Sequence, residues 1–269
     1  MKVKLTVEYA GESFHGWQSQ GELLTVQGSL ESALDVFLKG EAKKFNIIAP
    51  EKVFIQGSGR TDSGVHARAQ VASFSWPEQF EFSPLRIKSA LNALTPQALT
   101  IRLVEQVEDR FDARHSPHIK CYSYKIIYRG EEEKAARMSA VDGGRGWVIT
   151  KPLNIRSMIL AAKILEGQHD FQSFRAIDCS AKSTIRTVIR SELVRISDNE
   201  LNYYIYGKGF LKQMVRIVVG TLVELGSNES AIDSMRTILE SRDRTKAGKT
   251  APAEGLFLEW VRYDGENLL

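Results

Sequence analysis

Residues 58–67 read SGRTDSGVHA and place Arg60, Asp62 and His66 among glycines, directly after the apolar run VFIQ. In extended backbone, side chains two residues apart point to the same side, so Arg60 and Asp62 can face one cleft. A hairpin turn, an ion site, a phosphate cradle and a catalytic aspartate are all open interpretations. The loop lacks the GxxxxGK[ST] pattern of a phosphate-binding loop and has too few oxygen ligands for an EF-hand.

Among these readings, a lone carboxylate at Asp62 could act as a nucleophile or a base, with nearby cations keeping it charged. His66 is better suited to a local hydrogen bond than to catalysis. The loop is nine residues or more between strand-like segments, and loops of this length carry function more often than short ones.

The elements around this loop are predicted from hydrophobic periodicity. Alternating patterns predict strands over residues 2–9, 52–56, 70–76, 99–107, 120–128 and 255–263, and a hairpin around SDNE at 197–200. Apolar stripes with capping residues predict helices over 25–39 (N-cap Thr25), over 83–94, from Asn154 to before Gly167, and over 210–225 and 229–241.

Each half of the chain mixes antiparallel-type strands with two helices, which predicts an α+β fold rather than a doubly wound sheet. We place the boundary near residue 110, giving an N-terminal domain over 1–110 and a C-terminal domain over 111–269. The charged, Gly-rich stretch 129–146 is predicted to be a surface loop or insertion.

Two other segments carry candidate side chains whose roles the pattern leaves open. On the predicted helix 210–225, Lys212 and Arg216 lie on a narrow polar stripe, which is either solvated or directs Arg216 at Asp62 across a cleft. Gly220 on the same stripe would let another backbone approach closely. Tyr122 alternates with Tyr124 on a strand, a pattern more typical of a core tyrosine than of a binding residue.

Charge and composition bear on the core, on a nucleic-acid partner, on a metal and on the cellular location of the protein. The 269 residues carry 36 cations against 33 anions, and 43% of them are apolar, so a core can form while evidence for a polyanion partner is weak. Scattered basic residues could still line one groove and bind a nucleic-acid backbone in a salt-dependent way.

The two cysteines have no metal-ligand spacing, and we expect no metal. The N-terminus lacks a signal sequence and no apolar run approaches ~18 residues, so we expect a cytoplasmic protein outside the membrane.

The segment GRTDSGVHARAQVASF closely resembles the signature of the tRNA pseudouridine synthase A family, whose catalytic aspartate matches Asp62. Other blocks agree in the same order along the whole chain: YAGESFHGWQSQ (9–20), RFDARHSPHIKCYSY (110–124), GQHDFQSF (167–174), IRTV (185–188), GKGFLKQMVRIVVGTLVELG (207–226) and AGKTAPAEGLFL (247–258). Ala10 replaces the usual aspartate of the first block, Lys120 stands where the family has arginine, and 130–146 matches only loosely.

The resemblance implies a two-domain α+β pseudouridine synthase fold, with mainly antiparallel sheets flanked by helices, a central basic cleft and usually a homodimer. It implies isomerisation of uridine to pseudouridine in the tRNA anticodon stem-loop, at positions 38, 39 and 40, with no cofactor. The implied catalytic residues are Asp62, Arg216 as its partner, and Tyr122, which also provides an aromatic floor for a flipped base. The expected substrate-binding set is Tyr122, Arg60, His66, Arg68, Arg114, Lys182 and Lys212.

Three questions stay open at this point. Asp62 could add covalently to C1′ of the ribose or abstract a ribose proton. A non-catalytic RNA-binding protein on the same scaffold is the main alternative function, and a hydrolase that uses Asp62 is a second one, although no second catalytic carboxylate or Ser/His pair has a recognisable motif.

Overall fold

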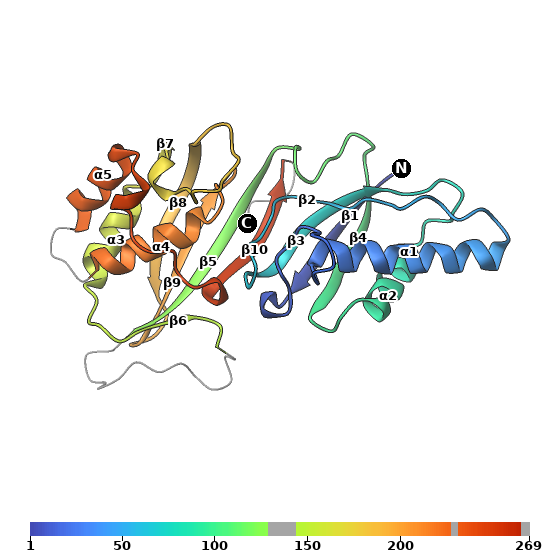
Figure 1. The fold of residues 1–269 in the computed structure, drawn as a ribbon, viewed down its shortest axis with the longest axis horizontal. Helices are drawn as coiled ribbons and strands as arrows, with labels where there is room; N and C mark the ends of the chain where they lie inside the picture. Colours follow the sequence, from blue (N-terminus) through green and yellow to red (C-terminus); the bar gives the residue numbers. More distant parts are fainter. Residues whose placement is uncertain (129–143, 227–230, 265–269) are drawn as a thin grey trace. The chain divides into compact units, whose positions relative to one another are not determined.

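The computed structural model describes residues 1–128, 144–226 and 231–264 (Figure 1). Its contacts divide these residues into two compact units. Unit 1 comprises Met1–His118 and the C-terminal residues from Leu258, and unit 2 comprises Ile119–Phe257. The predicted domains at 1–110 and 111–269 stay a prediction. The predicted loop at 129–146 lies almost entirely outside the described residues.

The strands of unit 1 follow the order β4-β1-β3-β10, with a two-residue strand, β2, beside β3. β1 pairs antiparallel with β3 and β4, and β2 pairs antiparallel with β3. These strands are β1 (Lys2–Tyr9), β2 (Gln56–Gly57), β3 (His66–Ser75), β4 (Leu99–Val107) and β10 (Leu256–Tyr263). Every second residue of β1 is buried, from Val3 to Tyr9, as the alternation of its sequence predicts.

Two helices accompany these strands, α1 (Val26–Phe45) and α2 (Pro84–Leu94); they contact each other, and α2 contacts β4 (Figure 1). Thr25 caps α1 as predicted, because its side chain accepts a hydrogen bond from the Gly28 N–H at 3.2 Å. The helix runs past the predicted end at 39, because residues 41–44 (EAKK), after Gly40, are good helix formers. It stops where Asn46 takes a left-handed conformation.

The predicted strand over 52–56 is wrong: only Gln56 of that segment is in a strand, as the first residue of β2. The Ile55 N–H donates to the carboxylate of Glu31 on α1 at 3.1 Å, and Lys52 forms an ion pair with the same carboxylate at 3.2 Å. A buried helix side chain therefore satisfies backbone that would otherwise join a strand ladder.

The strands of unit 2 follow the order β5-β9-β8-β7 with antiparallel pairing, and β6 pairs in parallel with β5. These strands are β5 (His118–Tyr128), β6 (Trp147–Ile149), β7 (Gly167–Asp170), β8 (Ile185–Arg195) and β9 (Glu200–Gly207). The predicted hairpin at 197–200 joins β8 to β9 and is confirmed. The strands β6 and β7, which are three and four residues long, were not predicted.

Three helices of unit 2 contact one another, α3 (Ile155–Lys163), α4 (Met214–Leu225) and α5 (Ala231–Ser241), and α3 contacts β8 (Figure 1). Asn154 caps α3 as predicted, accepting a hydrogen bond from the Ser157 N–H at 3.0 Å. α4 begins four residues later than predicted, because Gln213 adopts a left-handed conformation with φ 60°. Lys212 therefore lies before the helix rather than on its stripe.

Short 3-10 turns complete the described chain, and each connects longer elements: η1 (Gly11–Ser13), η3 (Gln172–Phe174), η4 (Arg244–Lys246) and η5 (Ala253–Gly255). Mostly antiparallel strands flanked by helices confirm the predicted α+β fold. Within the described ranges, the helices are too short or too polar to cross a bilayer.

Candidate functional site

The loop that carries Asp62 is held by residues of the chain's first 20 positions. The Trp17 N–H donates to the Thr61 carbonyl at 3.1 Å, and the Ser63 hydroxyl donates to the Phe14 carbonyl at 3.3 Å. The Val65 N–H donates to the Asp62 carbonyl at 3.2 Å and closes the turn. The Gly-rich loop is therefore tied along its length, and Asp62 sits half-buried on it.

Two glycines permit this close contact between segments. Gly16 has φ 88°, and a Cβ at Gly16 would lie 2.8 Å from the Thr61 carbonyl oxygen. A Cβ at Gly11 would lie only 2.2 Å from the Val65 carbonyl oxygen. The glycines of the block at 9–20 thus allow its backbone to pack against the backbone of the Asp62 loop.

Buried hydrogen bonds hold both sides of the loop to the sheet. The Tyr9 hydroxyl on β1 lies 2.8 Å from the Thr61 hydroxyl, and burial raises the pKa of Tyr9 to about 12. Gln70 on β3 accepts from the Ser58 hydroxyl at 2.6 Å and donates to the Gly59 carbonyl at 3.0 Å. Side-chain bonds to rigid strands therefore fix the backbone just before Asp62.

The structure gives His66 and Arg60 different environments. His66 is only 2% exposed, and its Nδ1 accepts a hydrogen bond from the Gly11 N–H at 3.1 Å. His66 thus serves as a hydrogen-bond partner, as predicted, but for a backbone group 55 residues away rather than a local one. Substrate contact by His66 stays a prediction that this burial does not favour. Arg60 is exposed and makes no ion pair with the residues that the structure describes.

Tyr122 lies on β5 in unit 2, where it pairs across the sheet with Ile205 on β9. Its ring meets that of Phe210 edge to face, with centroids 5.3 Å apart, and it is 8% exposed. Phe210 thus fixes the plane of the Tyr122 ring. Tyr124, two residues further along β5, is fully buried, and its hydroxyl donates to the Pro252 carbonyl at 2.8 Å. Tyr124 is therefore a core residue, whereas Tyr122 lies at the edge of the core.

Arg216 lies in the first turn of α4 and is half-buried. Its Nε donates to the Ala251 carbonyl at 2.8 Å, and the Ala251 N–H donates back to the Arg216 carbonyl at 3.1 Å. The predicted close approach of a second backbone at Gly220 is confirmed, because a Cβ there would lie 1.7 Å from the Lys249 carbonyl oxygen.

The remaining basic candidates differ in their partners. Arg68 pairs with Glu259 at 3.1 Å, and Lys212 pairs with Asp178. Arg114 and Lys182 are exposed and form no ion pair with described residues. Unit 1 carries Arg60 and Asp62 on one loop and His66 at the start of β3, and unit 2 carries Tyr122 and Arg216. The meeting of Asp62 with Arg216 stays a prediction.

Sequence reasoning missed the residues that hold the candidate groups, namely Tyr9, Thr61 and Gln70 around Asp62 and Ala251 beside Arg216. One signal was present: the first and last blocks of the family resemblance, at 9–20 and 247–258, contain glycines and small residues that make these contacts. Local periodicity does not indicate which distant segment each of these blocks contacts.

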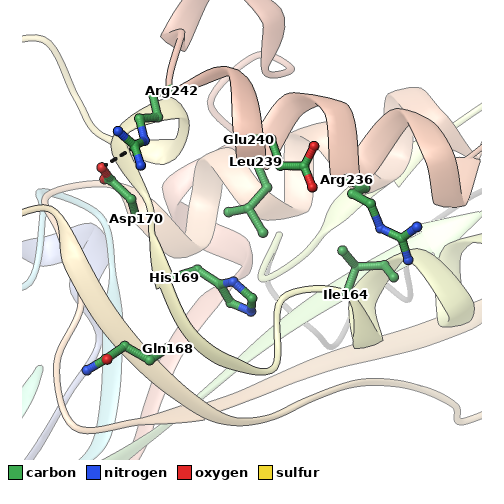
Figure 2. A pocket seen from close by; sticks show the side chains of 8 residues that line it. All are labelled: Ile164, Gln168, His169, Asp170, Arg236, Leu239, Glu240 and Arg242. Atoms are coloured by element: carbon green, nitrogen blue, oxygen red, sulfur yellow. Dashed lines mark ion pairs between the residues drawn. The ribbon is translucent and has the colours of Figure 1, made fainter.

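A pocket of about 640 Å³ in unit 2 contains none of the predicted site residues (Figure 2). It is lined by Ile164, Gln168, His169, Asp170, Arg236, Leu239, Glu240 and Arg242. Figure 2 shows the Asp170–Arg242 ion pair, at 3.2 Å, and the His169 Nε2 donates to the Glu166 carbonyl at 2.7 Å.

The contacts of this pocket give the block at 167–174 a structural role. Ser173 donates to the Ile238 carbonyl at 2.7 Å, near the end of α5, and Asp170 holds Arg242 just beyond that end. Side chains of the block thus satisfy the last turn of α5. Across the described residues, no three His, Cys, Asp or Glu side chains gather in a way that could hold a metal ion.

Comparison with known proteins gives matches over nearly the whole chain. A family model described as tRNA pseudouridine synthase matches residues 5–116 and 161–264. The chain is 38% identical over 267 residues to tRNA pseudouridine synthase A of Rhodospirillum rubrum, covering 99% of this chain and 89% of the relative. It is 37% identical over 265 residues to that of Ehrlichia canis, covering 98% and 100%. It is 38% identical over 269 residues to that of Bartonella tribocorum, covering 97% and 99%.

Likeness to solved structures is weaker. The crystal structure of a Cbf5-Nop10-Gar1 complex covers 95% of this chain and 56% of its own, at 11% identity and a TM-score of 0.27. A score this low supports no statement about this chain.

Proposed function

We propose that this chain, which belongs to the tRNA pseudouridine synthase family, isomerises uridine to pseudouridine in tRNA, at positions 38, 39 and 40 of the anticodon stem-loop. The observation that carries the proposal is the Asp62 loop. The sequence resemblance matches its aspartate to the family's catalytic residue, while Trp17 and Gln70 hold the loop backbone and Tyr9 holds the Thr61 side chain. A catalytic group needs such support, because misplacement by about 1 Å can cost ~100-fold in rate.

The reaction breaks the bond between N1 of uracil and C1′ of its ribose and forms a bond between C5 and the same C1′. The proton on C5 leaves and N1 gains one, so the product is an isomer of the substrate. Asp62 either adds to C1′ and is displaced when C5 attacks, or removes a ribose proton and returns it. Both routes require an ionised carboxylate at the sugar.

The roles of Arg216 and Tyr122 follow from their chemistry. A guanidinium opposite Asp62 would hold the carboxylate charged and oriented by two parallel hydrogen bonds. The uracil must leave the base stack to be reached, and we propose that the Tyr122 ring, whose plane is set by the edge-to-face contact with Phe210, stacks against it. The tyrosine hydroxyl is also a candidate to take or relay the C5 proton.

Affinity for tRNA would come mainly from cations on the RNA backbone, for which Arg60, Arg68, Arg114, Lys182 and Lys212 are the candidates. We assign Arg60, which is exposed beside Asp62, to the RNA near the flipped base. The family resemblance supports a homodimer, and we place the protein in the cytoplasm.

The test replaces Asp62 by asparagine, which keeps the size of the side chain and removes its charge. Single-turnover pseudouridine formation on tRNA should be abolished, while tRNA affinity persists because it depends on phosphate contacts. Asp35→Asn is the control, since Asp35 pairs with Lys39 on the exposed side of α1. Residual turnover in purified Asp62→Asn protein would remove Asp62 from the mechanism. Wild-type protein that binds tRNA without forming pseudouridine would favour the non-catalytic alternative.

A further inference from the structure

We infer that residues 247–252, here called the strap, position the Arg216 guanidinium through the carbonyl of Ala251. The inference rests on the proposed catalytic role of Arg216 and adds how unit 2 orients that side chain. It assigns Thr221, on the same helix, as a positioning residue that acts through the strap.

The contact between Arg216 and the strap is reciprocal. The Arg216 Nε donates to the Ala251 carbonyl at 2.8 Å, while the Ala251 N–H donates to the Arg216 carbonyl at 3.1 Å. One residue of the strap therefore bonds both the main chain and the side chain of one residue of α4. The Nε bond fixes the plane of the guanidinium and, with it, the directions of its two terminal nitrogens.

The rest of the strap is held along the same face of α4. Thr221 accepts a hydrogen bond from the Gly248 N–H at 2.9 Å, and Glu224 accepts one from the Lys249 N–H at 2.9 Å. The two backbones approach so closely that a Cβ at Gly220 would lie 1.7 Å from the Lys249 carbonyl oxygen. A side chain at Gly220 would therefore push the strap off the helix.

The other end of the strap is tied to β5, the strand that carries Tyr122. The Tyr124 hydroxyl donates to the Pro252 carbonyl at 2.8 Å, and Gly255 lies so near the Tyr124 ring that a Cβ would come within 2.5 Å of it. Burial raises the pKa of Tyr124, so its hydroxyl keeps the proton that makes this bond. The strap thus links two elements of unit 2 that carry the proposed catalytic groups Tyr122 and Arg216.

Thr221 offers the most selective way to loosen the strap. Its hydroxyl donates to the Ile217 carbonyl at 2.8 Å and accepts the Gly248 N–H, so Thr221→Val keeps the shape of the side chain and loses the acceptor for the strap. Thr221→Ser restores the hydroxyl. Thr237→Val is a matched control, because Thr237 on α5 makes the same bond four residues back, to Asp233 at 2.8 Å, on an exposed face.

The first measurement follows the Arg216 Nε–H directly by NMR in protein labelled at arginine with ¹⁵N. The signal is assigned by its loss in Arg216→Lys. We expect it to be protected from solvent exchange in wild type, Thr221→Ser and Thr237→Val, and to lose protection at least ~10-fold in Thr221→Val, since that variant removes a bond of the strap. Unchanged protection in Thr221→Val would overturn the inference.

The second measurement is single-turnover pseudouridine formation at saturating tRNA, together with the tRNA dissociation constant and a thermal melt. We expect Thr221→Val to slow turnover at least ~10-fold with affinity unchanged, and Thr221→Ser and Thr237→Val to resemble wild type. Loss of Nε protection without slower turnover would overturn the positioning role, as would equal loss of rate in Thr237→Val. Absence of turnover in wild type would instead contradict the proposed function, and the NMR result would still decide whether the strap holds Arg216.

Discussion

The Tyr9 hydroxyl lies 2.8 Å from the Thr61 hydroxyl, and both side chains are buried, at 3% and 7% exposure. This bond joins the end of β1, the first strand of the chain, to the residue immediately before Asp62. The position of the candidate catalytic aspartate is therefore set by a strand more than 50 residues away in sequence.

Removing the Tyr9 hydroxyl should impair turnover as well as stability. Tyr9→Phe keeps the ring and leaves Thr61 with one hydrogen bond fewer, which we expect to cost about 1 kcal/mol of unfolding free energy. Because Thr61 then loses its fixed orientation, single-turnover pseudouridine formation should slow by ~10-fold or more.

The matched control for that prediction is Tyr203→Phe. Tyr203 in unit 2 is buried and lies 2.8 Å from the Ser191 hydroxyl, so the same type of bond is lost away from the Asp62 loop. Urea melts should show similar losses of stability for both variants. If both also slowed turnover equally, the Tyr9–Thr61 bond would have no special connection with Asp62.

Tyr9 should also make stability depend on alkaline pH. Its pKa is about 12 in the folded protein, because of burial, and near 10 when unfolded, so only the folded state keeps the phenolic proton between these values. This contribution is complete below pH ~10 and is lost as pH rises towards ~12, by about 2–3 kcal/mol. Tyr9→Phe should therefore lose less unfolding free energy than wild type between pH 9 and 11.5 in urea melts. Parallel pH profiles would contradict the assignment.

Variants of Tyr122 separate the ring from the hydroxyl. Tyr122→Phe keeps the stacking surface, which is worth roughly 1–3 kcal/mol per base, and Tyr122→Ala removes it. If the ring alone matters, the phenylalanine variant should keep most turnover and the alanine variant should lose it. If the hydroxyl handles the C5 proton, the phenylalanine variant should stall after the base has been reattached. Single-turnover assays that found both variants near wild type would place Tyr122 outside the site.

The tRNA dissociation constant should rise steeply with salt, linearly in a log–log plot, because cations that bind phosphates release counterions. Arg60→Ala and Lys182→Ala should each reduce the slope by about 1, since neither residue has an anionic partner among the described residues. Arg68→Ala and Lys212→Ala should reduce it less, because Glu259 and Asp178 already neutralise those cations. A flat salt response would mean that all four are ordinary surface charges.

The two arginines proposed for the site should respond differently to removal. Arg216→Met leaves the Ala251 carbonyl without its donor and should cost about 1–3 kcal/mol of stability together with turnover. Arg216→Lys should keep the fold and lose most activity, because lysine lacks the two-pronged geometry. Arg60→Ala should change stability by less than about 0.5 kcal/mol and still impair turnover on tRNA. Thermal melts in which Arg60→Ala and Arg216→Met were equally destabilised would reverse our assignment of their roles.

The sequence alone determined much of the local structure. Capping residues and apolar periodicity located α1 at Thr25, α3 at Asn154 and the turn between β8 and β9, because these features depend on residues a few positions apart. The ordered family blocks predicted Asp62, Tyr122 and Arg216 as candidate site residues, a prediction that stays open. A glycine on the polar stripe of α4 predicted the close backbone contact at Gly220, which is confirmed.

Predictions failed where distant contacts override local preference. Residues 52–56 read as a strand, but the buried Glu31 carboxylate takes the Ile55 N–H, so the strand is reduced to its last residue and Gly57. The helix predicted from 210 begins at Met214, because the left-handed backbone of Gln213 interrupts it and leaves Lys212 outside.

Only the tertiary structure decided how the candidate groups are held. Tyr9 and Gly16 meet Thr61, and Ala251 meets Arg216, across 35 to 52 residues of chain. Periodicity reports the side of a helix or strand on which a residue lies, but not which other segment that side contacts. From its glycines alone, the Asp62 loop would be expected to be flexible. In the folded chain, hydrogen bonds from β1, β3 and the segment after β1 fix it, and Gly11 and Gly16 of that segment allow its backbone to pack closely against the loop.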